Sequence, residues 1–262
     1  MRNLRLVWIL FKLKLSRTMV FRFNFFSASF VDGSLFIMQL IVFNAIYGRM
    51  ERIGDWSHAQ MIVFIGTFSL LNAVNMVIYF FGINDLPAKI VSGDLDHYLT
   101  KPMNPLIRLT FEEINPGSLP LVAMSLIIIC YGAARLDTPV TALNVAGYAV
   151  LVILMIVLYY DMEVIIRCAP LYAMSISTVN ELEGNLLILC FRVPGTLFKG
   201  VFKVIFYFFL PYGIMSTIPT QMLTGMLTPA GFAYGVGVAV LFTWLALWLW
   251  KTGLKRYRSA SS

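Results

Sequence analysis

Five polar side chains lie inside or beside long apolar stretches, where a charge or an amide could do chemistry within a membrane. They are Asp32, Asn72, Asn75, Asp161 and Glu163. A charge surrounded by hydrocarbon is costly, so such residues usually face protein or water and mark a transport pathway. Asn72 and Asn75 share one helix face and could hydrogen-bond a neighbouring helix or a substrate. These five residues are therefore candidates for a pathway or for polar contacts between helices.

Each candidate also has a purely structural interpretation. Asp161 and Glu163 lie near the end of an apolar stretch, where the headgroup region begins. Glu163 could also pair with Arg167, which follows it by four residues. The two asparagines could simply support helix packing. Asp32 is the better pathway candidate, because it lies well inside its stretch and precedes Gly33, which permits a kink or close helix contact.

A polar segment at residues 83–105 separates two of the apolar stretches and carries signals for short helices. Its sequence is INDLPAKIVSGDLDHYLTKPMNP. Asp85 shortly before Pro87 favours a helix start, and Ser92-Gly93 favours a stop. The segment is therefore predicted to begin with a short helix.

The second half of this segment repeats the pattern. Asp94 is placed to cap a second turn over residues 95–99. Lys101-Pro102 ends that turn, and Asn104-Pro105 leads into the next element. The whole segment is predicted to form a compact helical elbow, although a capped loop between two spans would satisfy the same signals.

Patterns for ATP hydrolysis, metal binding and disulfides are absent from the sequence. No G-x-x-x-x-G-K-[ST] motif occurs, so nothing in this chain would cradle ATP phosphates. His58 and His97 lie far apart, and the three cysteines show neither metal nor disulfide spacing. No Ser/His or paired-Asp constellation is evident. We therefore expect no catalytic residue and no metal site in this chain.

The composition determines which elements must position these residues. Hydrophobic residues make up 59% of the 262 and charged residues only 13%, against about 25% charged in soluble domains. A bilayer can accept such a chain because lipid solvates the outward faces. The net charge is +7, but the basic residues gather at the chain ends and between alternate apolar stretches. That distribution fits a membrane surface and disfavours nucleic-acid binding.

Six apolar stretches are long enough to cross a bilayer as helices of about 20 residues. They cover residues 25–47, 59–82, 118–134, 143–166, 201–218 and 231–250, with Pro211 interrupting the fifth. Residues 4–22 instead combine one apolar helix face with many cations, which is typical of an interfacial helix. The basic flank of the first span is the alternative. The predicted fold is an all-α membrane protein, one domain over residues 1–262, with six transmembrane helices and an interfacial helix within residues 1–24.

Lys and Arg are divided unevenly between the two sides of these spans. With the N-terminus inside, 17 of the 20 fall on inner segments, and the outer ones hold Arg49, Arg52 and Arg135. The positive-inside rule then places both termini in the cytoplasm. The two long connections, residues 83–105 and 167–200, would also lie on the cytoplasmic side.

The elbow resembles the cytoplasmic signature of ABC type-2 transporter permeases, which are membrane subunits of ATP-driven exporters. The resemblance rests on Gly93, Leu95, Asp96, Leu99 and Pro102. It extends to Phe191-Arg192-Val193-Pro194 before the fifth span and to the ending KTGLKRYRSAS. The basic N-terminus and the six-span layout match as well, so the resemblance covers almost the whole chain.

The resemblance implies a division of labour. The elbow would be a short cytoplasmic coupling helix between spans two and three, docking on a separate ATP-binding cassette subunit. The docking residues would be Asp85, Gly93, Asp94, Leu95, Asp96, Leu99 and Pro102. ATP and Mg would belong to that partner, so this chain would carry no cofactor. A second permease, identical or related, would complete an export pathway surrounded by lipids in the bacterial inner membrane.

Two other classes of function remain open from the residues alone. An ion-coupled secondary transporter would favour matching helix breaks in two repeats, but Pro211 has no counterpart in the first half. A membrane-embedded enzyme would need nucleophiles or acids clustered at one depth. Dependence of transport on ATP would separate the exporter from the secondary transporter.

Overall fold

The computed structural model describes residues 12, 22–172, 183–185, 187, 189–190 and 193–257, without the side chains of residues 22–29, 31, 32 and 35. The predicted interfacial helix of residues 1–24 lies almost wholly outside the described residues. The described chain is helical apart from one short hairpin, in which β1 (Arg52–Ile53) pairs with β2 (Trp56–Ser57). The all-α class predicted from the sequence is thus confirmed.

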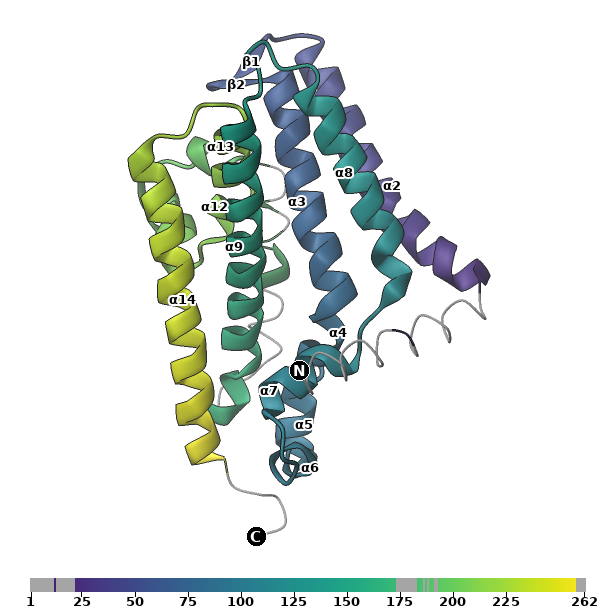
Figure 1. Ribbon diagram of the computed structural model, residues 1–262, viewed down its shortest axis with the longest axis vertical. Coiled ribbons are helices and arrows are strands. Elements are labelled where there is room, and N and C mark those ends of the chain that lie inside the picture. The colour runs from purple at the N-terminus through teal and green to yellow at the C-terminus, as the bar shows by residue number, and fades with distance from the viewer. Residues whose placement is uncertain are drawn as a thin grey trace.

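Long helices run between the two ends of the molecule in the described part of the chain (Figure 1). They are α2 (Arg22–Tyr47), α3 (His58–Ile78), α8 (Leu119–Ala133), α9 (Ala142–Arg167) and α14 (Pro229–Arg256). Among described residues, α3, α8 with its leading turn η1 (Pro116–Ser118), α9 and α14 are long and apolar enough to cross a membrane. The apolar part of α2 with described side chains, Phe36–Tyr47, is shorter. These helices coincide with five of the six predicted stretches.

Local capping signals in the sequence fix where several of these helices begin. The Ser57 hydroxyl accepts from the Gln60 backbone N–H, and the Gln60 side chain accepts from the Ser57 backbone N–H, which forms a capping box before α3. Thr141 caps α9 through Asn144, and Thr228 caps α14 just before Pro229. The helix starts therefore follow from short-range chemistry.

Small residues set the close contact between α3 and α8. A Cβ at Gly66 would lie 2.8 Å from the Ile129 side chain, and one at Gly132 would lie 2.8 Å from the Val63 side chain. The hydroxyls of Ser69 and Ser125 hydrogen-bond across the same contact at 2.7 Å. Small and hydroxyl residues are what membrane helices use to approach closely. The elements α3 and α8 thus form a tight pair beside α2.

The predicted fifth span, residues 201–218, is sharply bent. It consists of α11 (Gly200–Val204), the π-helical turn η4 (Ile205–Phe209), α12 (Tyr212–Met215) and α13 (Thr217–Leu223). The segment bends by 78° between Gly200–Phe209 and Tyr212–Leu223. Leu210 leaves helical geometry just before Pro211, which cannot donate a backbone hydrogen bond. Proline therefore breaks the segment where the sequence indicated an interruption.

Both ends of this bent segment lie at the end of the molecule that carries the β1–β2 hairpin, which is called the hairpin end below. Before it, the Trp56 indole of β2 donates to Thr196 in η3 (Gly195–Leu197) at 2.7 Å. After it, the Gln60 amide near the start of α3 contacts the Met226 sulfur at 3.1 Å. Figure 1 places α12 and α13 beside α9 in the same half of the molecule. The structure therefore differs from a straight fifth span, because these contacts describe a re-entrant hairpin.

Glu183 and Thr196 make their contacts in different parts of the molecule. Glu183 pairs with Arg167, the last residue of α9, at the end away from the hairpin. Thr196 instead accepts a hydrogen bond from Trp56 of the β1–β2 hairpin. The predicted cytoplasmic connection over residues 167–200 does not stay on one side, and its later part belongs to the hairpin end.

Candidate functional site

Four short helices form the elbow at the end of the molecule opposite the hairpin (Figure 1). They are α4 (Phe80–Asn84), α5 (Leu86–Ser92), α6 (Asp96–Leu99) and α7 (Pro105–Glu112). A side chain at Gly82 would collide with the backbone carbonyl of Leu109, so glycine lets α4 and α7 touch. Short helices thus pack together over the segment for which the sequence predicted a helical elbow.

Most of the predicted signals for helix starts and stops lie at the ends of helices in the structure. Pro87 lies in the first turn of α5, and Gly93 ends that helix with a φ of 84°, in the left-handed region that favours glycine. The Asn104 side chain accepts from the Leu106 N–H at 2.9 Å, and Pro105 begins α7. These turns therefore follow directly from the sequence.

The predicted cap at Asp94 is wrong. Leu95 occupies the cap position of α6, and no side-chain cap bond forms there. The Asp94 carboxylate instead accepts from the Ser92 hydroxyl at 2.7 Å. This local hydrogen bond takes the place of a helix cap. Short polar side chains commonly form such alternative local bonds. Asp85 precedes α5 but also forms no side-chain cap bond.

The interior of the elbow is built around Leu95 and Tyr98. Leu95 is fully buried, so it holds the elbow together and offers no docking surface in this conformation. The Tyr98 ring lies between two cations, Lys89 at 5.4 Å and Arg108 at 4.8 Å from its centroid. Burial, followed by the Glu112 carboxylate, raises the pKa of Tyr98 above its usual range. Tyr98 is thus a packing residue of the elbow.

The elbow packs on the ends of two long helices. Its buried side chains share one cluster with Val164 and Cys168 of α9 and with Ala246 and Trp250 of α14. Beyond α14, burial and then the nearby Asp96 carboxylate raise the pKa of Tyr257. A force applied to the elbow would therefore reach α9 and α14 through direct contacts.

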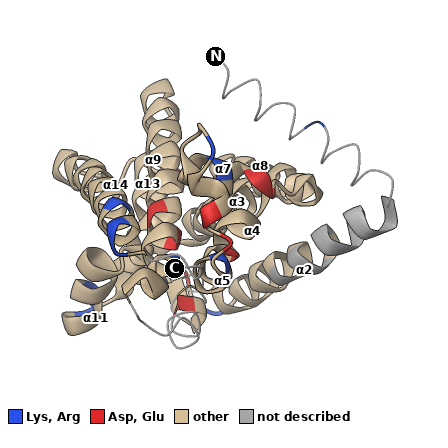
Figure 2. Cartoon of the chain, turned by 90° about the horizontal axis from the view of Figure 1, so that it is seen from below, with Lys and Arg blue, Asp and Glu red and all other residues tan. Residues whose placement is uncertain are grey.

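The elbow presents both charged and apolar side chains to its surroundings. Val91 is 75% exposed and Leu99 41% exposed. Of the predicted docking residues, Asp85, Asp94 and Pro102 are also exposed, whereas Gly93 and Asp96 are half-buried. Seen from this end, charged residues of both signs lie on and around the elbow (Figure 2). An exposed valine and leucine on such a charged surface form a small candidate contact patch.

A buried charge cluster lies where α9 meets the elbow. The Arg167 guanidinium is 3.1 Å from the Glu163 carboxylate and also pairs with Glu183. All three side chains are at most 5% exposed. The Tyr212 hydroxyl donates to Glu183 at 2.8 Å, and Arg167 reaches the Asn84 side chain of α4 at 3.5 Å. One arginine thus joins the elbow, α9 and the apex of the re-entrant hairpin.

The structure brings some of the predicted pathway residues together and separates others. Asn75 is buried on α3 close to Glu163, so these two candidates meet in the cluster. Asp161 lies outside the cluster, and its carboxylate accepts a hydrogen bond from the Thr243 hydroxyl of α14. Asn72 is half-buried outside the cluster, and the side chain of Asp32 lies outside the described residues.

Comparison with known protein families gives one match. A family model described as an ABC-2 family transporter protein matches residues 34–261. The chain belongs to the ABC-2 transporter family. No match was found among curated proteins or among solved structures. Because the matched region includes the elbow, the charge cluster and the re-entrant hairpin, all three lie within the family domain.

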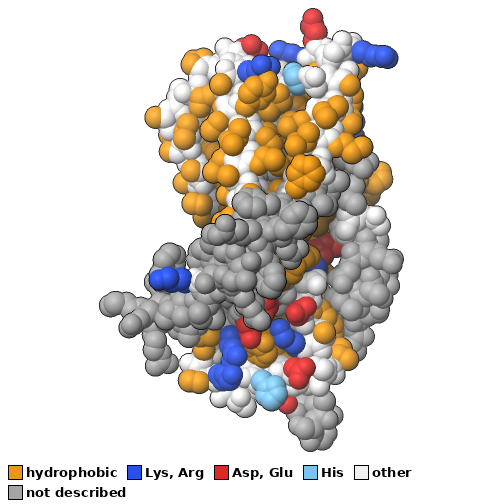
Figure 3. Space-filling view, turned by 90° about the vertical axis from the view of Figure 1, so that its right-hand side faces the viewer, with side chains coloured by type: hydrophobic (Ala, Val, Ile, Leu, Met, Phe, Trp, Pro, Cys, Tyr) orange, Lys and Arg blue, Asp and Glu red, His pale blue; other side chains and the backbone are white. Residues whose placement is uncertain are grey.

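Membership of the ABC-2 family identifies the chain as a permease of an ABC transporter and a multi-pass membrane protein. ABC-2 permeases in general pair with an ATP-binding subunit. Seen from the α2 side, the permease shows an apolar band below the charged hairpin end, and charged side chains at the elbow end (Figure 3). This distribution fits a bilayer between the two ends.

Sequence reasoning missed three residues of the charge cluster in this ABC-2 permease. Glu183 lies in the stretch 167–200, which was predicted to be a cytoplasmic connection, and Tyr212 and Asn84 carry no local motif. The available signal was Arg167, a cation directly after an apolar helix with two nearby acids. A buried arginine requires more than one partner, which could have prompted a search for a second carboxylate.

Proposed function

We propose that this ABC-2 permease is the membrane subunit of an exporter, driven by separate ATP-binding subunits and completed by a second permease. The observation that supports it best is the folded elbow, whose exposed Val91 and Leu99 lie beyond the apolar band. Apolar side chains exposed among charges on a cytoplasmic element suit contact with a protein partner. An ATP-binding subunit is the partner that the family supplies.

In this proposal the elbow acts as the coupling element, and Arg167 carries its movement into the membrane. The elbow touches Arg167 through Asn84, and Arg167 touches the re-entrant apex through Glu183 and Tyr212. A rigid displacement of the elbow would break or remake these bonds. The re-entrant hairpin would then shift at the far end of the pathway, with no ATP bound by this chain.

The proposed topology places the elbow and both termini in the cytoplasm and the β1–β2 hairpin outside. With α2, α3, α8, α9 and α14 as crossings, this orientation requires one further crossing between Arg167 at the end of α9 and Thr196. The basic residues of the N-terminal region, the elbow and the tail support this orientation. Lys199 and Lys203 were counted as inner in the prediction from the sequence, but this topology assigns them to the outer re-entrant segment. The inner side still holds most of the Lys and Arg residues without them.

Cysteine labelling in intact cells tests this topology. In a background lacking Cys130, single cysteines at Asp55, Asp137 and Lys199 should react with a membrane-impermeant maleimide, because all three positions lie at the hairpin end. A cysteine at Asp94 in the elbow should react only after permeabilisation. The Lys199→Cys variant discriminates between a re-entrant hairpin and a straight fifth span, since the latter would place residue 199 inside. Labelling of Asp94→Cys in intact cells would show that the orientation is the reverse of the one proposed.

The energy source of transport tests the function itself. In vesicles reconstituted with the permease and its ATP-binding partner, we expect movement of a fluorescent amphiphile to require ATP and to persist without an ion gradient. Vesicles containing the permease alone serve as the control and should show no ATP-dependent movement. Transport that follows an ion gradient and ignores ATP would support a secondary transporter instead.

A further inference from the structure

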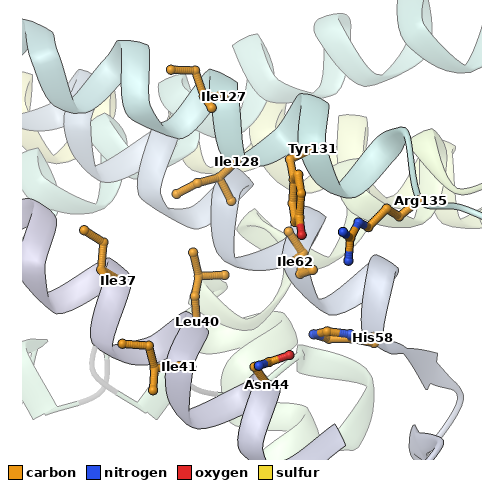
Figure 4. A pocket seen from close by; sticks show the side chains of 10 residues that line it. All are labelled: Ile37, Leu40, Ile41, Asn44, His58, Ile62, Ile127, Ile128, Tyr131 and Arg135. Atoms are coloured by element: carbon orange, nitrogen blue, oxygen red, sulfur yellow. The ribbon is translucent and has the colours of Figure 1, made fainter. Parts of the chain in front are cut away.

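A groove opens between α2 and α8 near the hairpin end, away from the elbow and the charge cluster. Its volume is about 380 Å³, which falls within the range of about 300–1,000 Å³ typical of ligand pockets. The floor and walls are branched apolar side chains from three helices, namely Ile37, Leu40, Ile41, Ile62, Ile127 and Ile128. Figure 4 shows all of them except Ile62 together on one side of the groove, with Ile62 nearer to Tyr131 and His58.

The other side of the groove is polar. Asn44, His58, Tyr131 and Arg135 lie together there in Figure 4. The Arg135 guanidinium sits 4.4 Å from the centre of the Tyr131 ring, which holds the cation at the mouth. In the described part of the chain, no carboxylate forms an ion pair with Arg135. The groove is therefore amphipathic, with a fixed positive charge at its outer end.

The groove also faces outward from the helix bundle. Ile41 is 64% exposed and Ile127 is 67% exposed on its rim. Both belong to the apolar band of a permease that crosses a membrane, so lipid is the medium they meet. The apolar part of the groove lies at acyl-chain depth, and Arg135 directly follows the end of α8, where headgroups begin.

We propose that this groove binds an anionic phospholipid from the leaflet at the hairpin end. One acyl chain would fill the isoleucine-lined part, and the phosphate would lie against Arg135, with His58 and Asn44 within reach of the headgroup. Arginine suits this role because its planar fork donates two hydrogen bonds to one phosphate. A zwitterionic lipid brings its own cation to the mouth, so the site should favour a headgroup with net negative charge. This inference depends on a membrane location and does not depend on ATP coupling.

Lipid retention by the purified complex tests the proposal. The wild-type complex is exchanged into detergent containing equal amounts of phosphatidylglycerol and phosphatidylcholine, washed, and examined by native mass spectrometry. We expect preferential retention of phosphatidylglycerol and a loss of about tenfold in that retention for Arg135→Gln. The matched control is Arg49→Gln, which removes an exposed cation at the same end but outside the groove, and should retain phosphatidylglycerol like the wild type.

A second pair of variants tests the apolar part of the groove. Ile41→Trp should obstruct it and lower the retention of phosphatidylglycerol, whereas Ile153→Trp, at a comparably exposed site on α9, should not. Equal retention of the two lipids by the wild type would overturn the proposal. So would equal losses in Arg135→Gln and Arg49→Gln. Efficient disulfide cross-linking between two copies carrying Ile41→Cys would also overturn it, because the groove would then be an interface between permeases.

Discussion

Replacing Arg167 with alanine is expected to destabilise the folded permease by about 3–5 kcal/mol, because two carboxylates would remain buried without their cation. Glu163 and Glu183 are almost fully buried, and Arg167 is the cation that both of them contact. Thermal unfolding in mild detergent, followed by the fraction that stays monodisperse on size exclusion, measures the change. We expect a lowered midpoint temperature and much reduced recovery from membranes.

The triple variant Glu163→Gln, Arg167→Met, Glu183→Gln is the matched control. It removes all three charges while keeping similar volumes, and such replacements of buried ion clusters are often neutral for stability. We expect it to regain most of the lost stability but to transport poorly, because the elbow no longer holds the re-entrant apex through Arg167. A stable Arg167→Ala variant would contradict the buried cluster. Normal ATP-driven transport by the triple variant would contradict the coupling role of Arg167.

Introducing aspartate at Val91 and Leu99 should release the ATP-binding subunit from the permease. Both side chains are exposed on the elbow and make no core contacts that the fold requires, so the permease itself should insert and fold normally. Central apolar contacts of an interface are commonly worth about 2 kcal/mol each, or roughly 30-fold in affinity. Co-purification of the two subunits in detergent, compared with the wild type, measures the loss.

The control for this variant is Leu143→Asp. Leu143 is an exposed leucine in the first turn of α9, at the hairpin end, where an acidic residue suits the helix dipole. The substitution is the same as at Leu99, but Leu143 is more exposed and lies at the opposite end of the molecule. Partner retention should be unaffected. Loss of the partner in both variants would point to general destabilisation, and retention in both would remove the elbow as the docking element.

The sequence predicted the features that depend on short-range chemistry. The apolar stretches predicted starts close to those of α3, α9 and α14, and the structure adds the caps Ser57, Thr141 and Thr228, which act on the helix next to them. The elbow follows from prolines and a glycine whose backbone preferences act within a few residues. Long apolar stretches likewise predict membrane-spanning helices, because each helix satisfies its own backbone hydrogen bonds.

The errors arose where the fold depends on residues far apart in the chain. A hydropathy pattern records how apolar a segment is, but not whether it crosses the membrane or turns back, so residues 201–218 looked like a span. Glu183 looked like a loop residue because its partners, Arg167 and Tyr212, are distant in sequence. Leu95 was expected at a surface, but it packs inside the elbow. Tertiary contacts decided all three cases.

The most direct test of the central claim is affinity purification of the tagged wild-type chain in mild detergent, followed by mass spectrometry of the proteins that accompany it. We expect recovery of a P-loop ATPase, with strong loss of that subunit from the Val91→Asp, Leu99→Asp variant and retention in Leu143→Asp. A second permease, if it differs from this chain, should appear in the same sample. A wild-type chain that purifies without any ATPase, under conditions that preserve other membrane complexes, would contradict the assignment of the elbow as its coupling element.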